Sequence, residues 1–599
     1  MIRTPLRPLA RILPARAKGE NPDAIERENI RLRHEAMRDK ARRRAEGRLL
    51  VLGATFFVAF GVIGLRMGVL AQTEPAEPRT SAAGAGILAQ RADIVDRSGR
   101  ILATNFDTHS LYAQPQQMIE PEKTARALVQ IFPDLKEERL LKDFSGKRKF
   151  LWVKKKISPE QMQAVHDIGE PGLLFGPREM RLYPNGTLAA HVLGGAGFGR
   201  EGVHAAEVIG VAGIEKYYDE RLRDPAQNHE PLTLSLDLPV QAAIERVLAG
   251  GMSIMNAKGA AAILMDVQTG EVISIASLPD FDPNDRPRPL VQGKAADSPL
   301  FNRAVQGVYE LGSTFKIFTT AQAMELGLVS PSTIIDATPP FRVGGHSIGE
   351  FNRKNYGKIS VSDVIIHSSN RGTGRIALQI GPERQQDFLK SLGFFKPVDF
   401  EMIEASGGQP LIPKRWTDLS TVTISYGHGL SSSPLHLAAG YAAIANGGRY
   451  VKPTLLKQDG PQAGVRVMSA AVAAESRKML RAVVVSGTAS MGEVPGYAVG
   501  GKTGTADKPK ENGGGYYDDK VIATFASMFP ADDPKYVLIV TLDEPVETSG
   551  VKPRRTAGWT AVPVASEIVA RVAPLLGLRP EIEQTPLAAI TLTSMADGD

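Results

Sequence analysis

A serine and a lysine stand three residues apart in the stretch YELGSTFK, at Ser313 and Lys316. The apolar run IFTTAQAMELGL follows, so the stretch predicts a helix that begins at Ser313. Residues three apart share a helix face, which lets the Lys316 amine reach the Ser313 hydroxyl. A neutral lysine can take the hydroxyl proton and create a nucleophile for acyl transfer. A serine that only caps a helix gives the same spacing, and SGVK at residues 549–552 is a second match in this chain.

A second polar stretch, HSSNRGTG, places Ser368 and Asn370 two residues apart. A hydroxyl and an amide in a polar turn can donate and accept hydrogen bonds around a substrate amide, or relay a proton. The same residues also fit a simple turn or a helix cap.

A third stretch, GGKTGTADK, precedes the β-rich run VIATFASMF and contains Lys502, Thr503, Gly504 and Thr505. On an edge strand this segment can pair with an extended peptide, because Gly504 has no side chain in the way. The charge of Lys502 would attract a carboxylate and favour the neutral form of Lys316. Alone, the stretch also fits a flexible loop; in order with the other two it is a specific signal for penicillin-recognising serine chemistry.

The composition excludes several other chemistries. The chain has no cysteine, so disulfides, thiolate metal sites and cysteine nucleophiles are absent. Its ten histidines are scattered without an H-E-x-x-H motif, and we expect neither a metal nor a cofactor. No G-x-S-x-G motif supports a Ser-His-Asp hydrolase. His367, beside the SSN turn, is predicted to be a packing or capping residue.

The positive charge is confined to the N-terminus. Residues 1–48 contain 14 Lys and Arg against 7 Asp and Glu, so the rest of the chain carries −1 of the total +6. This distribution does not favour nucleic-acid binding. The stretch LLVLGATFFVAFGVIGL follows at once and has no charge over 17 residues. We therefore predict a cytoplasmic basic tail over residues 1–48 and one membrane anchor over residues 49–71.

A cleaved signal peptide is the alternative for this segment. The basic region is too long, the apolar run exceeds the usual length, and no A-x-A site follows it. An uncleaved, single-pass anchor puts the remaining chain outside the cytoplasm, which in a bacterium is the periplasmic side of the inner membrane.

The rest of the chain predicts an α+β protein. Residues 72–90 are rich in Pro, Ala and Gly and predict a linker, and residues 91–227 predict a smaller, non-catalytic module. A second domain is expected over residues 228–580, with a weakly patterned tail at 581–599. Two β-runs around QTGE near its start and two more near its end predict one antiparallel sheet, flanked by helices and interrupted by a helical subdomain.

The ordered trio matches the signature of penicillin-recognising serine enzymes, S-x-x-K, S-D-N and K-T-G, with Ser369 in place of the Asp. These stretches resemble the transpeptidase domain of class B penicillin-binding proteins. The segments DIVDRSGRILATN and GIEKYYDERL resemble the pedestal module of that class, so the resemblance covers nearly all of the chain after the anchor. Small departures exist. Ser369 replaces the Asp of S-D-N, Leu311 stands where many members have proline, and His428 varies a Gly-rich stretch.

The resemblance implies a role for each motif residue. Ser313 would be acylated by the D-Ala-D-Ala end of a peptidoglycan stem peptide, with Lys316 as general base. Ser368 and Asn370 would relay protons and hold the substrate. The terminal carboxylate and peptide backbone would bind the segment formed by Lys502, Thr503, Gly504 and Thr505. β-Lactams would inhibit the enzyme at the same serine.

The resemblance is greatest to the FtsI type, which works at the division septum with an FtsW-type membrane glycosyltransferase and other division proteins. Two alternatives stay open at this point. One is the elongation-specific transpeptidase of the same class, and the other is a non-catalytic β-lactam sensor or scaffold. A secreted β-lactamase would be smaller and would lack the anchor.

Overall fold

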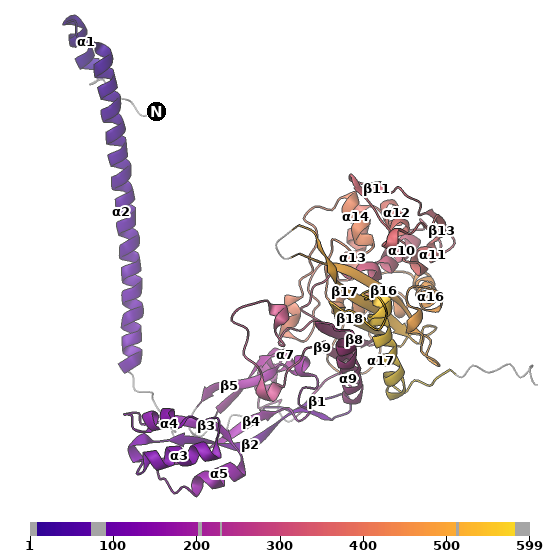
Figure 1. Cartoon of the computed structure of the whole chain (residues 1–599), viewed down its shortest axis with the longest axis horizontal. Coiled ribbons are helices and arrows are strands. Elements are labelled where there is room, and N and C mark those ends of the chain that lie inside the picture. The colour runs from indigo at the N-terminus through magenta and orange to yellow at the C-terminus, as the bar shows by residue number, and fades with distance from the viewer. Residues whose placement is uncertain (1–8, 73–90, 202–205, 228–229, 511–513, 582–599) are drawn as a thin grey trace, which may run out of the picture. The chain divides into compact units, whose positions relative to one another are not determined.

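The computed structural model describes residues 9–72, 91–201, 206–227, 230–510 and 514–581 (Figure 1). The predicted linker and C-terminal tail therefore lie outside the described residues, apart from Gln72 and Glu581. The chain divides into two compact units, residues 1–85 and residues 86–599.

The described residues of the first unit form two helices, α1 (Leu9–Ala17) and α2 (Pro22–Gln72). Helix α2 contains the predicted anchor but begins well before it, because the Ala-, Arg- and Glu-rich stretch ahead of the anchor is also helical. The segment Asp23–Met67 includes a window with a mean hydropathy of 2.1, long and apolar enough to cross a membrane.

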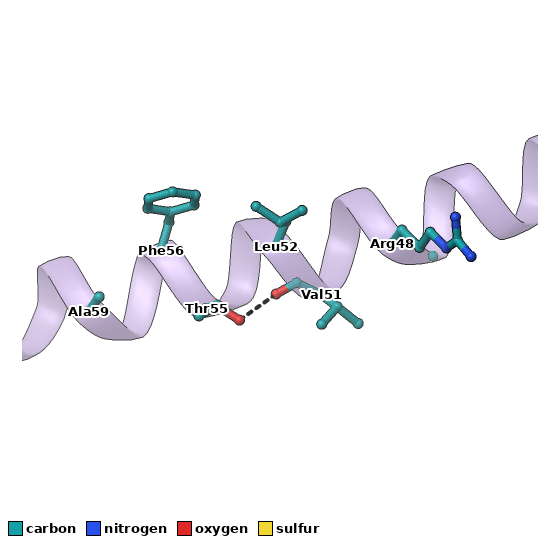
Figure 2. Close-up of a pocket in the computed structure, with 7 residues that line it drawn as sticks. Arg48, Val51, Leu52, Thr55, Phe56 and Ala59 are labelled. Atoms are coloured by element: carbon teal, nitrogen blue, oxygen red, sulfur yellow. Dashed lines mark hydrogen bonds between the residues drawn. The ribbon is translucent and has the colours of Figure 1, made fainter. Parts of the chain in front are cut away.

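One side of α2 shows how the predicted anchor accommodates a polar residue. Figure 2 shows Arg48 ahead of a surface formed by Val51, Leu52 and Phe56. The Thr55 hydroxyl donates a hydrogen bond of 2.8 Å to the Val51 carbonyl oxygen one turn earlier. The hydroxyl is thus satisfied within the helix, as a hydrocarbon environment requires.

A five-stranded antiparallel sheet forms the centre of the second unit, and it confirms the predicted sheet built from both ends of the domain. Its strand order is β16 (Gly500–Pro509), β17 (Tyr516–Phe529), β18 (Tyr536–Asp543), β8 (Gly259–Asp266) and β9 (Val272–Leu278). All residues of β9 and nearly all of β8 are buried. Because successive side chains point to opposite faces, both faces of the sheet must be covered. The covering helices are α9 (Leu238–Ile254), α15 (Pro434–Ala445), α16 (Ala470–Ser486) and α17 (Ala561–Leu575).

The predicted helical subdomain lies between β9 and β16 in the sequence (Figure 1). Its helices are α10 (Lys316–Glu325), α11 (Val361–Ile366), α12 (Asn370–Ile380), α13 (Pro382–Ser391) and α14 (Asp418–Ser425). Its short strand pairs are β10 (Ile334–Asp336) with β13 (Lys358–Ser360), β11 (Arg342–Val343) with β12 (His346–Ser347), and β14 (Arg449–Tyr450) with β15 (Val465–Arg466).

The pedestal module, defined here as residues 91–227, contains a second sheet. Its strands are β1 (Ile94–Val95), β2 (Ile101–Ala113), β3 (Leu151–Ile157) and β4 (Leu173–Leu182), joined by β7 (Leu232–Thr233) from beyond residue 227. Its helices are α3 (Pro121–Ile131), α4 (Glu137–Phe144), α5 (Pro159–His166), α6 (Ala190–Leu193), α7 (Gly213–Tyr217) and α8 (Asp219–Arg223), and β5 (Gly195–Glu201) pairs with β6 (Ala206–Ala212).

The pedestal module is divided between two hydrophobic cores. Its base, including Leu102, Val192 and Ile214, belongs to the same core as the central sheet. Its head, including Leu111 and Phe144, has a separate core. The hydrophobic core therefore does not stop at residue 227, and the base of the pedestal is packed as part of the catalytic unit.

Candidate active site

Ser313 lies on a tight turn and not in the α-helix that the sequence predicts. A 3-10 turn spans Gly312–Phe315, and α10 begins directly after it, at Lys316. Gly312 has φ +57, a left-handed conformation that an α-helix excludes. The turn leaves Ser313 partly exposed while its neighbours on both sides are buried.

Glycines bring three distant segments into backbone contact at this turn. A Cβ atom on Gly504 would lie 2.2 Å from the Leu311 carbonyl oxygen, and one on Gly312 would lie 2.9 Å from the Thr505 carbonyl oxygen. A Cβ on Gly427 would lie 1.9 Å from the Gly312 carbonyl oxygen. No side chain fits at these positions without moving the backbone. The K-T-G segment on β16 is therefore held directly beside Ser313.

Strand β16 is the end strand of the central sheet, which confirms the predicted edge position. It pairs on one side with β17 from Gly500 onwards. An extended peptide could add to its other side by main-chain hydrogen bonds.

Lys316 is completely buried and points towards the S-x-N motif. Its Nζ donates hydrogen bonds to the Ser368 carbonyl oxygen (2.5 Å), the Ser368 Oγ (3.0 Å) and the Asn370 Oδ1 (2.7 Å). Burial, followed by the charge of Lys502, holds the Lys316 pKa well below its ordinary value, and Glu350 opposes this shift. Two of the predicted motifs thus meet at one amine.

No hydrogen bond between Lys316 and the Ser313 hydroxyl occurs among the described residues. The three protons of a charged lysine amine match the three acceptors on Ser368 and Asn370. When the amine is neutral, its lone pair becomes free to accept a proton, and catalytic contacts often tighten only with substrate present.

Lys502 is also completely buried, and its Nζ donates to the Ser368 Oγ at 3.0 Å. Burial lowers the pKa of Lys502 to about 7. The Ser368 hydroxyl therefore accepts from both lysines, which leaves its own proton available for donation. Ser368 has φ +60, a conformation that costs a non-glycine residue about 1 kcal/mol, so the turn is held under strain at this point.

Ser369, the departure from S-D-N, is buried and caps α12 by accepting from the Gly372 N–H at 3.0 Å. Its hydroxyl points towards Glu350, to which it donates at 2.6 Å. No local signal in the sequence indicates Glu350, which lies 19 residues earlier.

The two threonines of the K-T-G segment also have partners that the sequence did not indicate. The hydroxyls of Thr503 and Thr488 lie 2.6 Å apart, and the Thr505 Oγ1 accepts from the Ala557 N–H at 3.0 Å. These partners are 15 and 52 residues away, beyond the range of a local motif.

Two histidines singled out by sequence contact aromatic rings, His367 that of Tyr356 and His428 that of Tyr426. The His367 ring stacks on Tyr356 with centroids 5.6 Å apart, which confirms the predicted packing role. Burial, then the charge of Lys316, lowers the His428 pKa to about 4, so this side chain is neutral at pH 7.

The second S-x-x-K match, at residues 549–552, lies in a loop between Glu547 and Arg554. In the described parts of the chain, no group of three or more His, Asp or Glu residues is arranged to hold a metal ion.

Comparison with known proteins identifies the class. Residues 260–569 match the family described as "Penicillin binding protein transpeptidase domain", and residues 86–227 match the "Penicillin-binding Protein dimerisation domain". The fold and the site therefore define a penicillin-binding transpeptidase with a preceding dimerisation domain.

Individual relatives narrow the class. The chain is 33% identical over 574 residues to the probable peptidoglycan D,D-transpeptidase FtsI of Caulobacter vibrioides, covering 93% of this chain and 94% of the relative. It is 27% identical to the peptidoglycan D,D-transpeptidase FtsI of Escherichia coli K12, covering 82% and 84%. The crystal structure of penicillin-binding protein 3 from Mycobacterium tuberculosis, in complex with aztreonam, matches with a TM-score of 0.62 and 26% identity, over 82% of this chain and 98% of that one. The chain belongs to the class B penicillin-binding proteins of the FtsI type.

Proposed function

We propose that this protein is a serine-type peptidoglycan D,D-transpeptidase that cross-links stem peptides through an acyl-enzyme on Ser313. The observation that carries the proposal is the pair of buried lysines, Lys316 and Lys502, beside a turn that exposes Ser313. The names of the FtsI relatives and the aztreonam complex of the structural relative support the same chemistry.

In the first step, neutral Lys316 takes the Ser313 proton while the Oγ attacks the carbonyl carbon of the penultimate D-Ala. The C–N bond to the terminal D-Ala breaks, an ester forms on Ser313, and the proton passes to the departing amine. The low pKa of Lys316 supports its role as base. Ser368, which accepts from both lysines, is placed to deliver the proton.

The substrate would lie along the free edge of β16. Its terminal carboxylate would be held by Lys502, Thr503 and Thr505, and its backbone would pair beside Gly504. In the second step, an amine from a neighbouring stem peptide attacks the ester. An amide cross-link forms, and the amine proton returns to the Ser313 oxygen through Lys316.

Covalent labelling tests this proposal. A fluorescent penicillin should label the full-length protein, and mass spectrometry should place the adduct on Ser313. The Ser313→Ala variant should not label, while Ser549→Ala, in the second S-x-x-K match, should label normally. If labelling persists in Ser313→Ala and is lost in Ser549→Ala, the nucleophile is Ser549 and not Ser313.

The proposed setting is the bacterial inner membrane, with α2 as a single span, residues 1–48 in the cytoplasm, and a periplasmic pedestal (91–227) and transpeptidase domain (228–580). The basic stretch ahead of an uncharged helix supports this orientation. An FtsW-type glycosyltransferase would supply the glycan strands, and other division proteins would act through the pedestal.

Depletion in cells tests the setting. Loss of a septal enzyme should give elongated cells that do not divide, with a fluorescent fusion at midcell during constriction. Rounded cells with a fusion along the lateral wall would assign the protein to elongation and leave the chemistry at Ser313 unchanged.

A further inference from the structure

Glu350 is a buried carboxylate at the start of α12, outside all three sequence motifs. It accepts hydrogen bonds from the Ser369 hydroxyl (2.6 Å), the Asn370 N–H (2.8 Å) and the Arg371 N–H (3.0 Å). Resting on the function proposed above, we propose that Glu350 is a positioning residue: its carboxylate fixes the first turn of α12 and so holds Ser368 and Asn370 in place for proton transfer with Lys316.

Helix chemistry explains why a carboxylate belongs at this point. The first N–H groups of a helix have no partner within it, and the helix dipole favours negative charge there. Glu350 takes the N–H groups of Asn370 and Arg371, while Ser369 takes that of Gly372. The first turn of α12 is thereby completely satisfied by two side chains.

The same loop also orients the Asn370 side chain. The Asn370 Nδ2 donates to the Gly349 carbonyl oxygen at 3.0 Å, which directs the Oδ1 to the Lys316 amine at 2.7 Å. Glu350 and Gly349 together hold both the backbone and the amide of Asn370. An error in the position of this loop would move the acceptor that faces the proposed base.

The loop is itself braced, so Glu350 is a rigid support. The Arg371 side chain donates to the carbonyl oxygens of Ile348 (3.1 Å) and Lys354 (3.3 Å) on either side of Glu350. Asn352 and Arg353 have φ values of +54 and +56, left-handed conformations that cost a non-glycine residue free energy. A loop held in this conformation fits a requirement for exact placement of the carboxylate.

Glu350 and Ser369 form one hydrogen-bonded pair. Some penicillin-recognising serine enzymes carry an acid at the position that Ser369 occupies in this chain. Here the carboxylate comes from residue 350, and the Ser369 hydroxyl is its hydrogen-bond donor. The two positions are coupled: one should be an acid and the other a neutral donor.

This coupling gives a sharp test, measured as the rate of acylation of the full-length protein by a fluorescent penicillin. Glu350→Gln should slow acylation roughly 10- to 100-fold, because a glutamine amide has only one acceptor oxygen and its NH₂ group must face a helix N–H that the carboxylate now satisfies. Ser369→Asp alone should slow it about tenfold, because two carboxylates then meet. The double variant should recover most of the wild-type rate, since the introduced amide at position 350 can donate to the introduced acid at position 369.

Glu401→Gln is the matched control. Glu401 is also buried and accepts from a hydroxyl (Thr454, 2.9 Å) and a backbone N–H (Leu455, 2.9 Å), with no hydrogen bond to the proposed site among the described residues. Its acylation rate should equal that of the wild type. Recovery in the Glu350/Ser369 double variant, together with an unchanged rate in Glu401→Gln, would assign the loss to the start of α12 and not to the loss of a buried carboxylate in general.

A wild-type rate in Glu350→Gln, or a double variant slower than either single variant, would overturn the inference. If Glu350→Gln does not fold, the acylation rate of Ser369→Asp tests the inference by itself. A wild-type rate in Ser369→Asp would also overturn the inference. A wild-type protein that does not label at all would instead refute the proposed function.

Discussion

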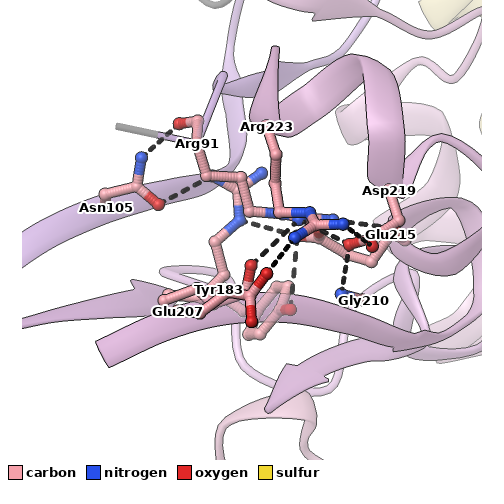
Figure 3. Close-up of polar contacts among 10 residues, drawn as sticks. Arg91, Asn105, Tyr183, Glu207, Gly210, Glu215, Asp219 and Arg223 are labelled. Carbon is pink, nitrogen blue, oxygen red and sulfur yellow. Dashed lines mark hydrogen bonds and ion pairs between the residues drawn. The ribbon is translucent and has the colours of Figure 1, made fainter. Parts of the chain in front are cut away.

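The pedestal base and the proposed active site both bury positive charge, but they do so in opposite ways. In the pedestal, Arg91 pairs with Glu215 at 2.6 Å and with Asp219 at 2.8 Å (Figure 3). Arg181 pairs with the other oxygen of Glu215 at 2.6 Å. In the site, neither Lys316 nor Lys502 has an ion pair among the described residues.

The pairing decides whether the charge is kept. Burial alone would lower the Arg91 pKa, but the neighbouring Glu215 and Asp219 raise it above its ordinary value. Lys502 lacks such a partner among the described residues, and its pKa falls to about 7. Arginine with carboxylates is suited to a permanent structural charge, whereas a buried lysine can give up its proton near neutral pH. Burial disfavours the charged form of both side chains. The paired arginine keeps its charge and stabilises the fold, whereas the buried lysine can lose its proton and take part in catalysis.

The largest expected effect is on acylation by Lys316→Arg. The guanidinium stays protonated and cannot act as a base, so the acylation rate by fluorescent penicillin should fall about 1,000-fold. The opposite exchange, Arg91→Lys, keeps a cation in the pedestal and should leave that rate unchanged. A Lys316→Arg variant that acylates within about tenfold of the wild type would remove the general-base role.

The second effect concerns stability and appears on the pedestal side. Glu215→Gln leaves Arg91 and Arg181 buried without their shared carboxylate, so the free energy of unfolding should fall by about 3 kcal/mol. Denaturant unfolding of the detergent-solubilised protein measures this change. Protein that remains folded should acylate at the wild-type rate; unchanged stability would mean that the pedestal pairs are no stronger than surface pairs.

In the proposed active site, removal of a buried charge should raise the free energy of unfolding and not lower it. Lys502→Met should raise the free energy of unfolding at pH 7 by about 2 kcal/mol, because it removes a buried amine that has no ion pair among the described residues. With a folded pKa of about 7 against an ordinary 10.5, the wild-type stability contribution is fully present above pH 10.5 and is lost as the pH falls towards 7. Unfolding measured between about pH 7 and 10 should show this slope in the wild type and a flatter one in Lys502→Met. Equal slopes would contradict the assignment.

The smallest effect tests the strain at Ser368. Glycine adopts φ +60 without cost, so Ser368→Gly should be about 1 kcal/mol more stable than Ser368→Ala. Both variants lack the hydroxyl and should lose acylation equally, which separates strain from chemistry. Thermal unfolding of the two variants side by side makes the measurement, and an Ala variant as stable as the Gly variant would show that the turn is unstrained.

The features that sequence analysis predicted correctly are local. The three motifs are short and contiguous, and the β-runs at both ends of the domain are apolar enough to place the central sheet. The predicted helix at Ser313 is only partly confirmed: Ser313 lies in a 3-10 turn, Gly312–Phe315, that leads directly into α10, and apolar periodicity cannot tell a 3-10 turn from the first turn of an α-helix.

The features that were missed depend on long-range contacts. Glu350 meets α12 across 19 to 21 residues, and Thr488 meets Thr503 across 15. Strand β7 joins the pedestal sheet from beyond residue 227, which explains how one core spans both predicted domains. Nothing in the local pattern of these residues differs from an ordinary loop or strand.

The two cores of the pedestal are joined through β2 and β4, and this link has a mechanical consequence. From Thr104 to Thr108, β2 pairs only with β4 among the described strands, and Asp107 lies directly opposite Glu179. Burial, then the charge of Asp107, raises the Glu179 pKa, and like charges in register weaken a strand pair. Two-stranded ribbons carry a larger twist than wider sheets. The head of the pedestal is therefore joined to the base through a narrow, strongly twisted ribbon, so a change in the twist of β2 and β4 would turn the head relative to the base.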